Sequence, residues 1–336
     1  MEADRGRRAI VGTAAALAVA AATATVSENS KAQTAPRMKG PRVYLDYDQA
    51  ELDAAYDQAV YAPNARDVQG RMRRLSAEAR KRLGTPKRFA YGPTDIEKLD
   101  VYPAAASLKG PNAPIQIFIH GGAWRSGTAA EHADAAELLH QAGAVYVVPD
   151  FTLVQDAADS LRSMAEQVRR SIAWVYKHAG EIGGDVNRIY LSGHSSGAHL
   201  AGVALVTDWQ REYGVPDDFL KGALLCSGMY DLKGPRLSAR SNYVKFDDAM
   251  EEALSAQRHL DKIRTPVLLV HGTLETPEFQ RQTREFAAAL KQSGKPVELL
   301  VAEGFNHFEI RETFANPFGI VGRALLAQMK LSINQI

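Results

Sequence analysis

The chain has 336 residues, with 40 lysine and arginine residues against 39 aspartate and glutamate residues, so its formal net charge is +1 and we expect no nucleic-acid partner. Hydrophobic residues form 46% of the chain and charged residues 24%, which excludes a disordered or fibrous protein and leaves enough apolar side chains for a sizeable core. The single cysteine, Cys226, cannot form an internal disulfide, and no Cys and His residues have zinc-ligand spacing, so we expect neither a metal nor a cofactor.

Residues 1–35 have the three-part layout of an export signal, with a basic start, an Ala-rich apolar run and a polar stretch of small residues. Arg7 and Arg8 precede the mild apolar run of residues 10–26, as in twin-arginine signals. This run is near the lower limit for a membrane-spanning helix, so we expect no stable span. The sequence therefore predicts export to the periplasm; the alternative is an Ala-rich tail on a cytoplasmic protein.

Residues 36–336 are expected to form a single domain. Residues 44–83 have apolar side chains three and four apart between charged ones, and Pro63 with Asn64 interrupts them, which predicts two helices ahead of a sheet. After Gly92 and Pro93, short apolar segments predict strands at 99–102, 115–120, 144–151, 188–194, 222–230, 266–272 and 297–304. Amphipathic stretches between and after them predict helices within 129–143, 158–179, 197–209, 279–294 and 321–332.

Continuously apolar strands that alternate with helices predict an α/β fold with a mostly parallel central sheet and helices on both faces. Active residues of such a fold lie in loops at the carboxyl ends of the strands. Residues 234–262 are long and polar for one connection, so we expect a small helical cap inserted over the site.

A nucleophile motif lies between a predicted strand and a predicted helix. Residues 193–197 read G-x-S-x-G around Ser195. The motif requires this context, because the nucleophile must lie on a strained turn from strand to helix whose close approaches only glycine tolerates. The alternative for so short a pattern is a glycine-rich turn with a capping serine.

A second glycine-rich turn follows the strand predicted at 115–120. Gly121 and Gly122 are in the sequence His-Gly-Gly-Ala-Trp, and their backbone N–H groups, together with that of Ser196, can stabilise an oxyanion. We therefore expect an oxyanion hole formed by these three residues.

A serine nucleophile needs a general base that is held by an acid. His307 is the best placed of the nine histidines, since it is in a short loop after the last predicted strand and precedes a C-terminal helix. Glu275 follows the preceding strand, which gives the chain order Ser195, Glu275, His307. We predict that these three residues form a catalytic triad. His194 and His199 flank the serine and are expected to support the site rather than act as bases.

Aromatic residues beside these loops are expected to line the substrate pocket: Trp124, Tyr230 and Phe308.

With these motifs in place, the sequence resembles the α/β-hydrolase superfamily, specifically the hormone-sensitive-lipase-like esterases and the arylformamidase (kynurenine formamidase) branch. The resemblance rests on HGGAW, GHSSGAHL, HGTLE and FNHF and covers roughly residues 44–330. It implies an α/β-hydrolase fold and a serine hydrolase of small esters or N-formyl arylamines. Two positions depart from the family pattern: Glu275 stands where aspartate is usual, and Ala123 replaces the third glycine of the esterase loop.

We therefore predict hydrolysis of small short-acyl or aryl carboxylic esters through an acyl-enzyme on Ser195. An N-formyl arylamide hydrolase is the first alternative, and export argues against it because breakdown of formylkynurenine belongs in the cytosol. The second alternative is a catalytically idle α/β-hydrolase that binds a ligand.

Overall fold

The computed structural model describes residues 38–105 and 112–332, so the predicted export signal lies outside the described residues. The chain divides into a unit of residues 1–39 and a unit of residues 40–336, and every element below belongs to the second unit. No helix among the described residues has both the length and the apolar character needed to cross a membrane.

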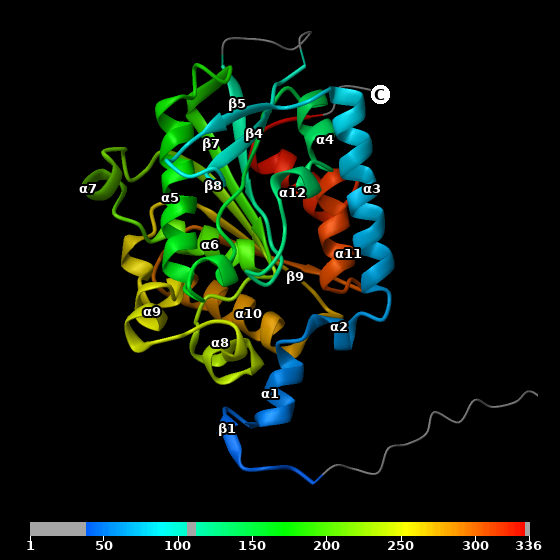
Figure 1. Ribbon diagram of the computed structural model, residues 1–336, viewed down its shortest axis with the longest axis vertical. Coiled ribbons are helices and arrows are strands. Elements are labelled where there is room, and N and C mark those ends of the chain that lie inside the picture. Colours follow the sequence, from blue (N-terminus) through cyan, green and yellow to red (C-terminus); the bar gives the residue numbers. More distant parts are fainter. Residues whose placement is uncertain (1–37, 106–111, 333–336) are drawn as a thin grey trace, which may run out of the picture. The chain divides into compact units, whose positions relative to one another are not determined.

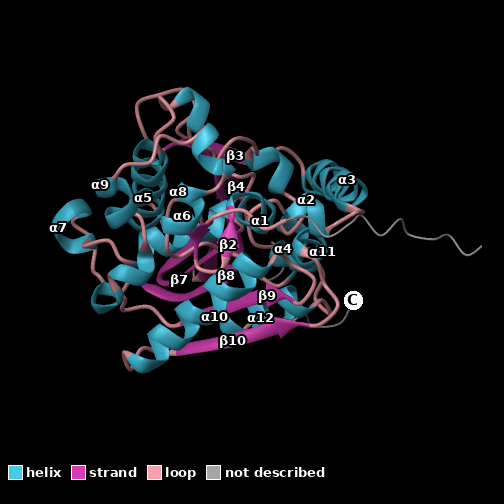
Figure 2. Cartoon of the chain, turned by 90° about the horizontal axis from the view of Figure 1, so that it is seen from below, coloured by secondary structure: helices cyan, strands magenta, loops and turns pink. Residues whose placement is uncertain are grey.

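An eight-stranded sheet forms the centre of this unit (Figure 1). Its strands, in chain order, are β3 (Lys87–Ala90), β4 (Lys98–Tyr102), β5 (Ala113–Ile119), β6 (Val145–Pro149), β7 (Gly184–His194), β8 (Leu220–Cys226), β9 (Val267–Gly272) and β10 (Val297–Ala302). The order across the sheet is β10-β9-β8-β7-β5-β6-β4-β3, and Figure 2 shows β10 and β3 at opposite edges. The six strands from β10 to β6 are parallel, whereas β4 and β3 pair antiparallel.

Alternating side chains of the strands serve two separate cores. In β5, Ile117 and Ile119 pack into the core on one face of the sheet, while Phe118 between them packs into the other. Leu191 and Tyr190 of β7 divide in the same way. Because both faces are buried, the strands lack the polar alternation of a half-exposed sheet, and the sequence shows them as continuous apolar runs.

Helices cover both faces of the sheet, which confirms the predicted fold class. One core contains side chains of α5 (Leu161–Lys177), α6 (Ser196–Leu205) and α10 (Pro277–Gln292). The other contains side chains of α4 (Ala136–Gln141), α11 (His307–Glu312) and α12 (Ile320–Gln328), with α3 (Ala65–Leu83) outside them in Figure 1. The short α7 (Trp209–Tyr213) precedes β8.

The segment before the sheet differs from the prediction of two helices. Residues 66–83 are helical as expected, within α3, but the first predicted helix is divided into α1 (Gln49–Ala55) and α2 (Gln58–Tyr61). Asp57 causes the division, since its carboxylate accepts a hydrogen bond from the N–H of Ala59 and so begins a new helix. A small hairpin of β1 (Arg42–Tyr44) and β2 (Tyr47–Asp48), which the sequence did not predict, comes before α1.

Short helices make up the predicted cap segment, residues 234–262. They are α8 (Lys233–Leu237), α9 (Asp248–Ala253) and three 3-10 helices at Ala239–Asn242, Ala256–Arg258 and Leu260–Lys262. Figure 1 shows α8, α9 and α10 near the end of the sheet to which the parallel strands point.

Candidate active site

The turn between β7 and α6 holds Ser195 in a strained backbone conformation. Its φ is 58° and its ψ is −126°, a region that residues with a side chain rarely adopt. Gly197 permits the turn, because an added Cβ would lie 2.1 Å from the carbonyl oxygen of Ile119 at the end of β5. The sequence therefore folds this segment into the strand-to-helix turn that its G-x-S-x-G motif predicts. The Ser195 side chain faces a cleft of about 800 Å³.

The loop after β5 lies directly against Ser195. A Cβ added to Gly121 would be 3.1 Å from the Cβ of Ser195 and 2.7 Å from the carbonyl oxygen of His194. Only glycine allows this approach, which gives a steric reason for the glycine at position 121. Gly122 has a φ of 123°, and Ala123 and Trp124 follow with φ of 54° and 64°, which turns the loop sharply.

Three backbone N–H groups are available beside the serine. Outside the helices and strands of the described residues, no backbone hydrogen bond has Gly121 or Gly122 as its donor. Ser196 occupies the first position of α6, where the N–H has no acceptor within the helix. The hydroxyl of Ser196 accepts a hydrogen bond from the N–H of Trp124 at 3.2 Å, which ties the two turns together. The geometry is compatible with the expected oxyanion hole.

His307 and Glu275 are hydrogen-bonded to each other. The Nδ1 of His307 donates to Oε2 of Glu275 at 2.8 Å, and both side chains are buried. This bond leaves the Nε2 lone pair of His307 free to accept a proton. His307 lines the same cleft as Ser195. The extra methylene of Glu275, compared with aspartate, does not prevent the contact.

His307 begins helix α11, whereas the sequence predicted a loop. Asn306 caps this helix by accepting the N–H groups of Phe308 and Glu309, and Glu309 accepts the N–H of Asn306 at 3.0 Å. This reciprocal cap fixes the backbone at His307. The capping box is better known in its S/T-x-x-E form than as N-x-x-E. The spacing of Asn306 and Glu309 is nevertheless the signal in the sequence that could have located the start of this helix.

Two further groups hold the Glu275 carboxylate, and neither was expected from the sequence. The hydroxyl of Ser227, just after β8, donates to Oε1 at 2.6 Å, and the N–H of Gly272 donates to the same oxygen at 2.6 Å. Oε2 is thereby left for His307. Ser227 lies inside the strand predicted at 222–230, so no signal in the sequence marked it as a partner of Glu275.

His194 and His199 support the site, as the sequence suggested. Nε2 of His194 donates to the carbonyl oxygen of His307 at 3.0 Å, and Nε2 of His199 donates to the carbonyl oxygen of Leu254 at 3.0 Å. Nδ1 of His199 accepts a hydrogen bond from the indole N–H of Trp124. Burial lowers the pKa of His194 well below its usual value and lowers the pKa of His199 to about 4, so both rings are neutral near pH 7.

The prediction that three aromatic residues line the pocket is only partly correct. Phe308 lines the cleft. Tyr230 does not, because it is fully buried and stacks on Phe286 with ring centroids 4.4 Å apart. Trp124 is also buried, since the left-handed turn directs its ring into the protein toward His199.

Side chains before the sheet and in the cap complete the cleft. Residues before the sheet that line it include Tyr56 just after α1, Gln58 of α2 and Met72 of α3, and the 3-10 helix Ala239–Asn242 contributes Arg240. No group of three or more His, Cys, Asp or Glu side chains in the described part of the chain is arranged to hold a metal ion. The cleft thus brings together Ser195, the hydrogen-bonded pair of His307 and Glu275, and the backbone N–H groups beside the serine.

Comparison with known proteins relates this chain to hydrolases. A family model described as BD-FAE matches residues 99–222, and the prolyl oligopeptidase family model matches residues 166–316. The chain is 34% identical over 242 residues to kynurenine formamidase of Danio rerio, covering 70% of this chain and 79% of that protein. It is 27% identical over 222 residues to esterase LipQ of Mycobacterium tuberculosis, covering 61% of this chain and 52% of that protein.

Solved esterases share the fold. Esterase 2 of Thermogutta terrifontis has a TM-score of 0.59 at 23% identity, covering 74% of this chain and 91% of that chain. Esterase LipW of Mycobacterium marinum has a TM-score of 0.62 at 18% identity, covering 82% of this chain and 89% of that chain.

The buried His199 predicts a loss of stability in acid. Its pKa is about 4 in the folded protein, against about 6.5 for an exposed histidine, so the unfolded state binds the proton more tightly. The stabilisation is complete above about pH 6.5 and falls by about 3 kcal/mol toward pH 4. His199→Gln, which cannot titrate, should show a shallower decline in the free energy of unfolding between pH 7 and pH 4.5, measured by denaturant titration. Equal slopes for both proteins would contradict this assignment.

Proposed function

Since the chain belongs to the esterase and arylformamidase family of α/β-hydrolases, we propose that it is a serine hydrolase that cleaves small short-acyl or aryl carboxylic esters through an acyl-enzyme on Ser195. The observation that carries the proposal is the hydrogen bond of 2.8 Å between His307 and Glu275, in the same cleft as a serine on a strained turn. A glycine-rich turn with a capping serine would need no such buried pair.

In the proposed mechanism, the Oγ of Ser195 attacks the carbonyl carbon of the ester while its proton passes to Nε2 of His307. The ionised Glu275 keeps the ring oriented and stabilises the imidazolium. The N–H groups of Gly121, Gly122 and Ser196 donate to the oxyanion.

The tetrahedral intermediate then expels the alcohol, which takes the proton from His307 and leaves an acyl group on Ser195. Water attacks this acyl group next, with His307 accepting the proton of the water. The Ser195 oxygen departs with that proton, so the carboxylic acid is released and the enzyme is restored.

Ser195→Ala should remove turnover while the protein stays folded, because the variant has no oxygen that can accept the acyl group. We expect kcat for p-nitrophenyl acetate to fall by about 10⁴-fold or more. The assay should be accompanied by thermal unfolding, in which the variant should match the wild type. Undiminished hydrolysis by a correctly folded variant would overturn the proposed function.

Glu275→Gln keeps the shape of the side chain but removes the charge that stabilises the imidazolium, so kcat should fall by about 10⁴-fold. Ser227→Ala removes one of the three hydrogen bonds that reach the Glu275 carboxylate and leaves the charge, so its loss should be about tenfold. This order, measured as kcat with the same ester, separates the acid from a group that positions it. Glu275→Gln with nearly wild-type activity would place the acid elsewhere.

Short esters should be better substrates than long ones or formamides. An ester needs less leaving-group protonation than an amide. Residues before the sheet and the cap segment border the cleft, and we expect them to limit the length of the acyl group. We expect kcat/KM to be higher for p-nitrophenyl acetate than for p-nitrophenyl palmitate or N-formylkynurenine. A preference of about tenfold for the formamide would replace the proposal with its alternative.

That alternative, an N-formyl arylamide hydrolase, is favoured by one specific observation. The kynurenine formamidase of Danio rerio is 34% identical to this chain, a higher identity than that of esterase LipQ, at 27%. The substrate comparison above distinguishes the two.

We also propose that residues 1–35 export the protein by the twin-arginine route, since Arg7 and Arg8 precede a mild apolar run. Cells that express Arg7→Lys/Arg8→Lys should retain the protein in the cytoplasmic fraction, whereas the wild type should be in the periplasmic fraction. A double variant that still reaches the periplasmic fraction would exclude the twin-arginine route, and wild-type protein in the cytoplasmic fraction would favour the cytoplasmic alternative.

A further inference from the structure

Arg240 presents a buried positive charge in the same cleft as Ser195 and His307. It lies in the 3-10 helix Ala239–Asn242 of the cap segment, and only 8% of its surface is exposed. Transferring a charge from water into a protein interior is costly unless an opposite charge or several hydrogen bonds compensate it. The hydrogen-bond partners of Arg240 therefore show whether its charge is compensated within the protein.

No carboxylate pairs with Arg240 among the described residues. One terminal nitrogen donates to the hydroxyl of Tyr243 at 2.9 Å, and the other donates to the backbone carbonyl oxygen of Tyr56 at 3.0 Å. The Nε–H is buried and has no acceptor. A guanidinium has five N–H donors, so most of its hydrogen-bonding capacity is unused.

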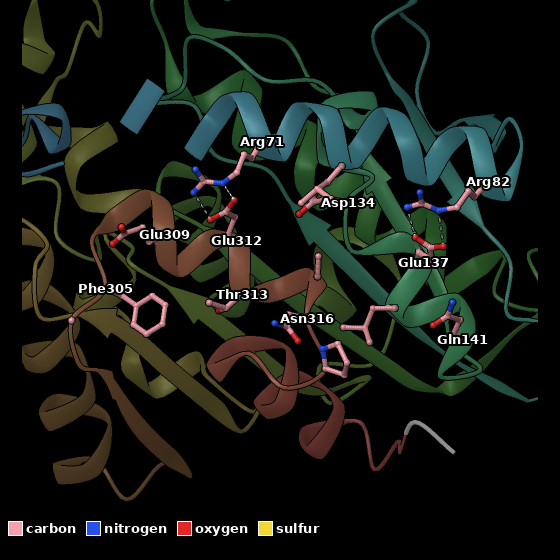
Figure 3. Close-up of a pocket in the computed structure, with 15 residues that line it drawn as sticks. Arg71, Arg82, Asp134, Glu137, Gln141, Phe305, Glu309, Glu312, Thr313 and Asn316 are labelled. Atoms are coloured by element: carbon pink, nitrogen blue, oxygen red, sulfur yellow. Dashed lines mark hydrogen bonds and ion pairs between the residues drawn. The ribbon is translucent and has the colours of Figure 1, made fainter. Parts of the chain in front are cut away.

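Three other arginines show how a carboxylate compensates a guanidinium in this protein. Figure 3 shows a second cavity, of about 700 Å³, in which Arg71 is paired with Glu312 and Arg82 with Glu137, each through two hydrogen bonds. Arg311, which is 2% exposed, makes two hydrogen bonds of 2.7 Å to Asp134. These three arginines, two of them much more exposed than Arg240, each have a carboxylate, whereas the buried Arg240 has none.

Carboxylates do line the cleft, but they are used elsewhere. Asp53 accepts the N–H of Ala239 at 2.6 Å, and Asp57 accepts the N–H of Ala59 at 3.0 Å. Glu131 is exposed and accepts the hydroxyl of Thr128. None of the three forms an ion pair with Arg240 in the described part of the chain.

Aromatic rings surround the guanidinium, and one of them also contacts His307. Its central carbon lies 5.2 Å from the ring centre of Trp124, which follows the glycine-rich loop, and 5.9 Å from that of Phe279. The ring of Phe279 is in turn 5.0 Å from the ring of His307. Cation–π contacts offset part of the cost of burial but use no N–H donor, so they leave the donors free for an anion.

We propose that Arg240 binds a carboxylate of the substrate, so that the enzyme prefers small esters that carry an anionic group over neutral esters of the same size. The guanidinium fork matches a carboxylate in shape, and such charge-assisted pairs are strong where water is excluded. The inference rests on the proposed hydrolase function and names the substrate class of that site. The carboxylate can belong to the acyl group or to the alcohol, and the test distinguishes them.

Two pairs of substrates test the preference, each pair differing only in a carboxylate or its neutral primary amide. The alcohol side is tested with 3-acetoxybenzoate against 3-acetoxybenzamide, and the acyl side with the mono-p-nitrophenyl ester of adipic acid against the p-nitrophenyl ester of adipamic acid. In one pair or both, the wild type should hydrolyse the carboxylate with a kcat/KM at least about tenfold higher, which corresponds to about 1.4 kcal/mol of binding energy.

Substitutions then assign the preference to Arg240. Arg240→Gln should reduce the ratio of the two kcat/KM values to near one, and Arg240→Lys should retain part of it, because the lysine keeps the charge without the planar fork. Arg236→Gln is the matched control: Arg236 lies in the same cap segment but pairs with Asp248 and Glu251, so its loss should leave the ratio unchanged.

The outcomes are distinct from a failure of the proposed function. If the wild type hydrolyses all four esters but shows no preference in either pair, or if Arg240→Gln keeps the wild-type ratio, the carboxylate site is wrong while the hydrolase proposal stands. If Ser195→Ala retains hydrolysis, the hydrolase proposal itself fails. Should Arg240→Gln not fold, the wild-type ratios and the Arg240→Lys ratio decide the question.

Discussion

A single buried carboxylate connects the elements that make up the site. Glu275 is 1% exposed, and its charge is tolerated because three donors reach it: the hydroxyl of Ser227 after β8, the N–H of Gly272 at the end of β9, and the imidazole of His307 at the start of α11. Since β7, which leads into the turn of Ser195, is paired to β8, this one group relates that turn, two further strand ends and His307. Removing any donor leaves a buried charge less compensated.

The strands and helices could be predicted from the sequence where their side chains are fully buried. The prediction failed where the side chains are only partly buried. Residues 115–120 and 188–194 appear as apolar runs because β5 and β7 are covered on both faces. Strand β3 was missed because Lys87 and Arg88 at this sheet edge remain exposed and give no apolar run. Asp57, which caps the start of α2, similarly divides a stretch whose apolar spacing alone indicates one helix.

Only the parts of the site that lie in local sequence motifs could be predicted. The turn of Ser195 and the loop of Gly121 can be recognised from the sequence, because their close backbone contacts require glycines at fixed positions. Ser227 and Arg240 have no such local signature, since each acquires its role from residues distant in sequence: Ser227 is 48 positions from Glu275, and Arg240 is 184 positions from Tyr56. Tyr230 was expected in the pocket because it is near the end of a predicted strand. Its side chain instead packs into the core against Phe286.

The central claim is that Ser195 is the nucleophile activated by His307 and Glu275. It is tested most directly by treating the protein with a fluorophosphonate, which phosphonylates activated serines, and by locating the adduct with mass spectrometry of the intact chain and its peptides. The account predicts one adduct per chain, on the peptide that contains Ser195, and strongly reduced labelling in His307→Ala. Absence of an adduct in folded protein, or an adduct on a different residue, would contradict it.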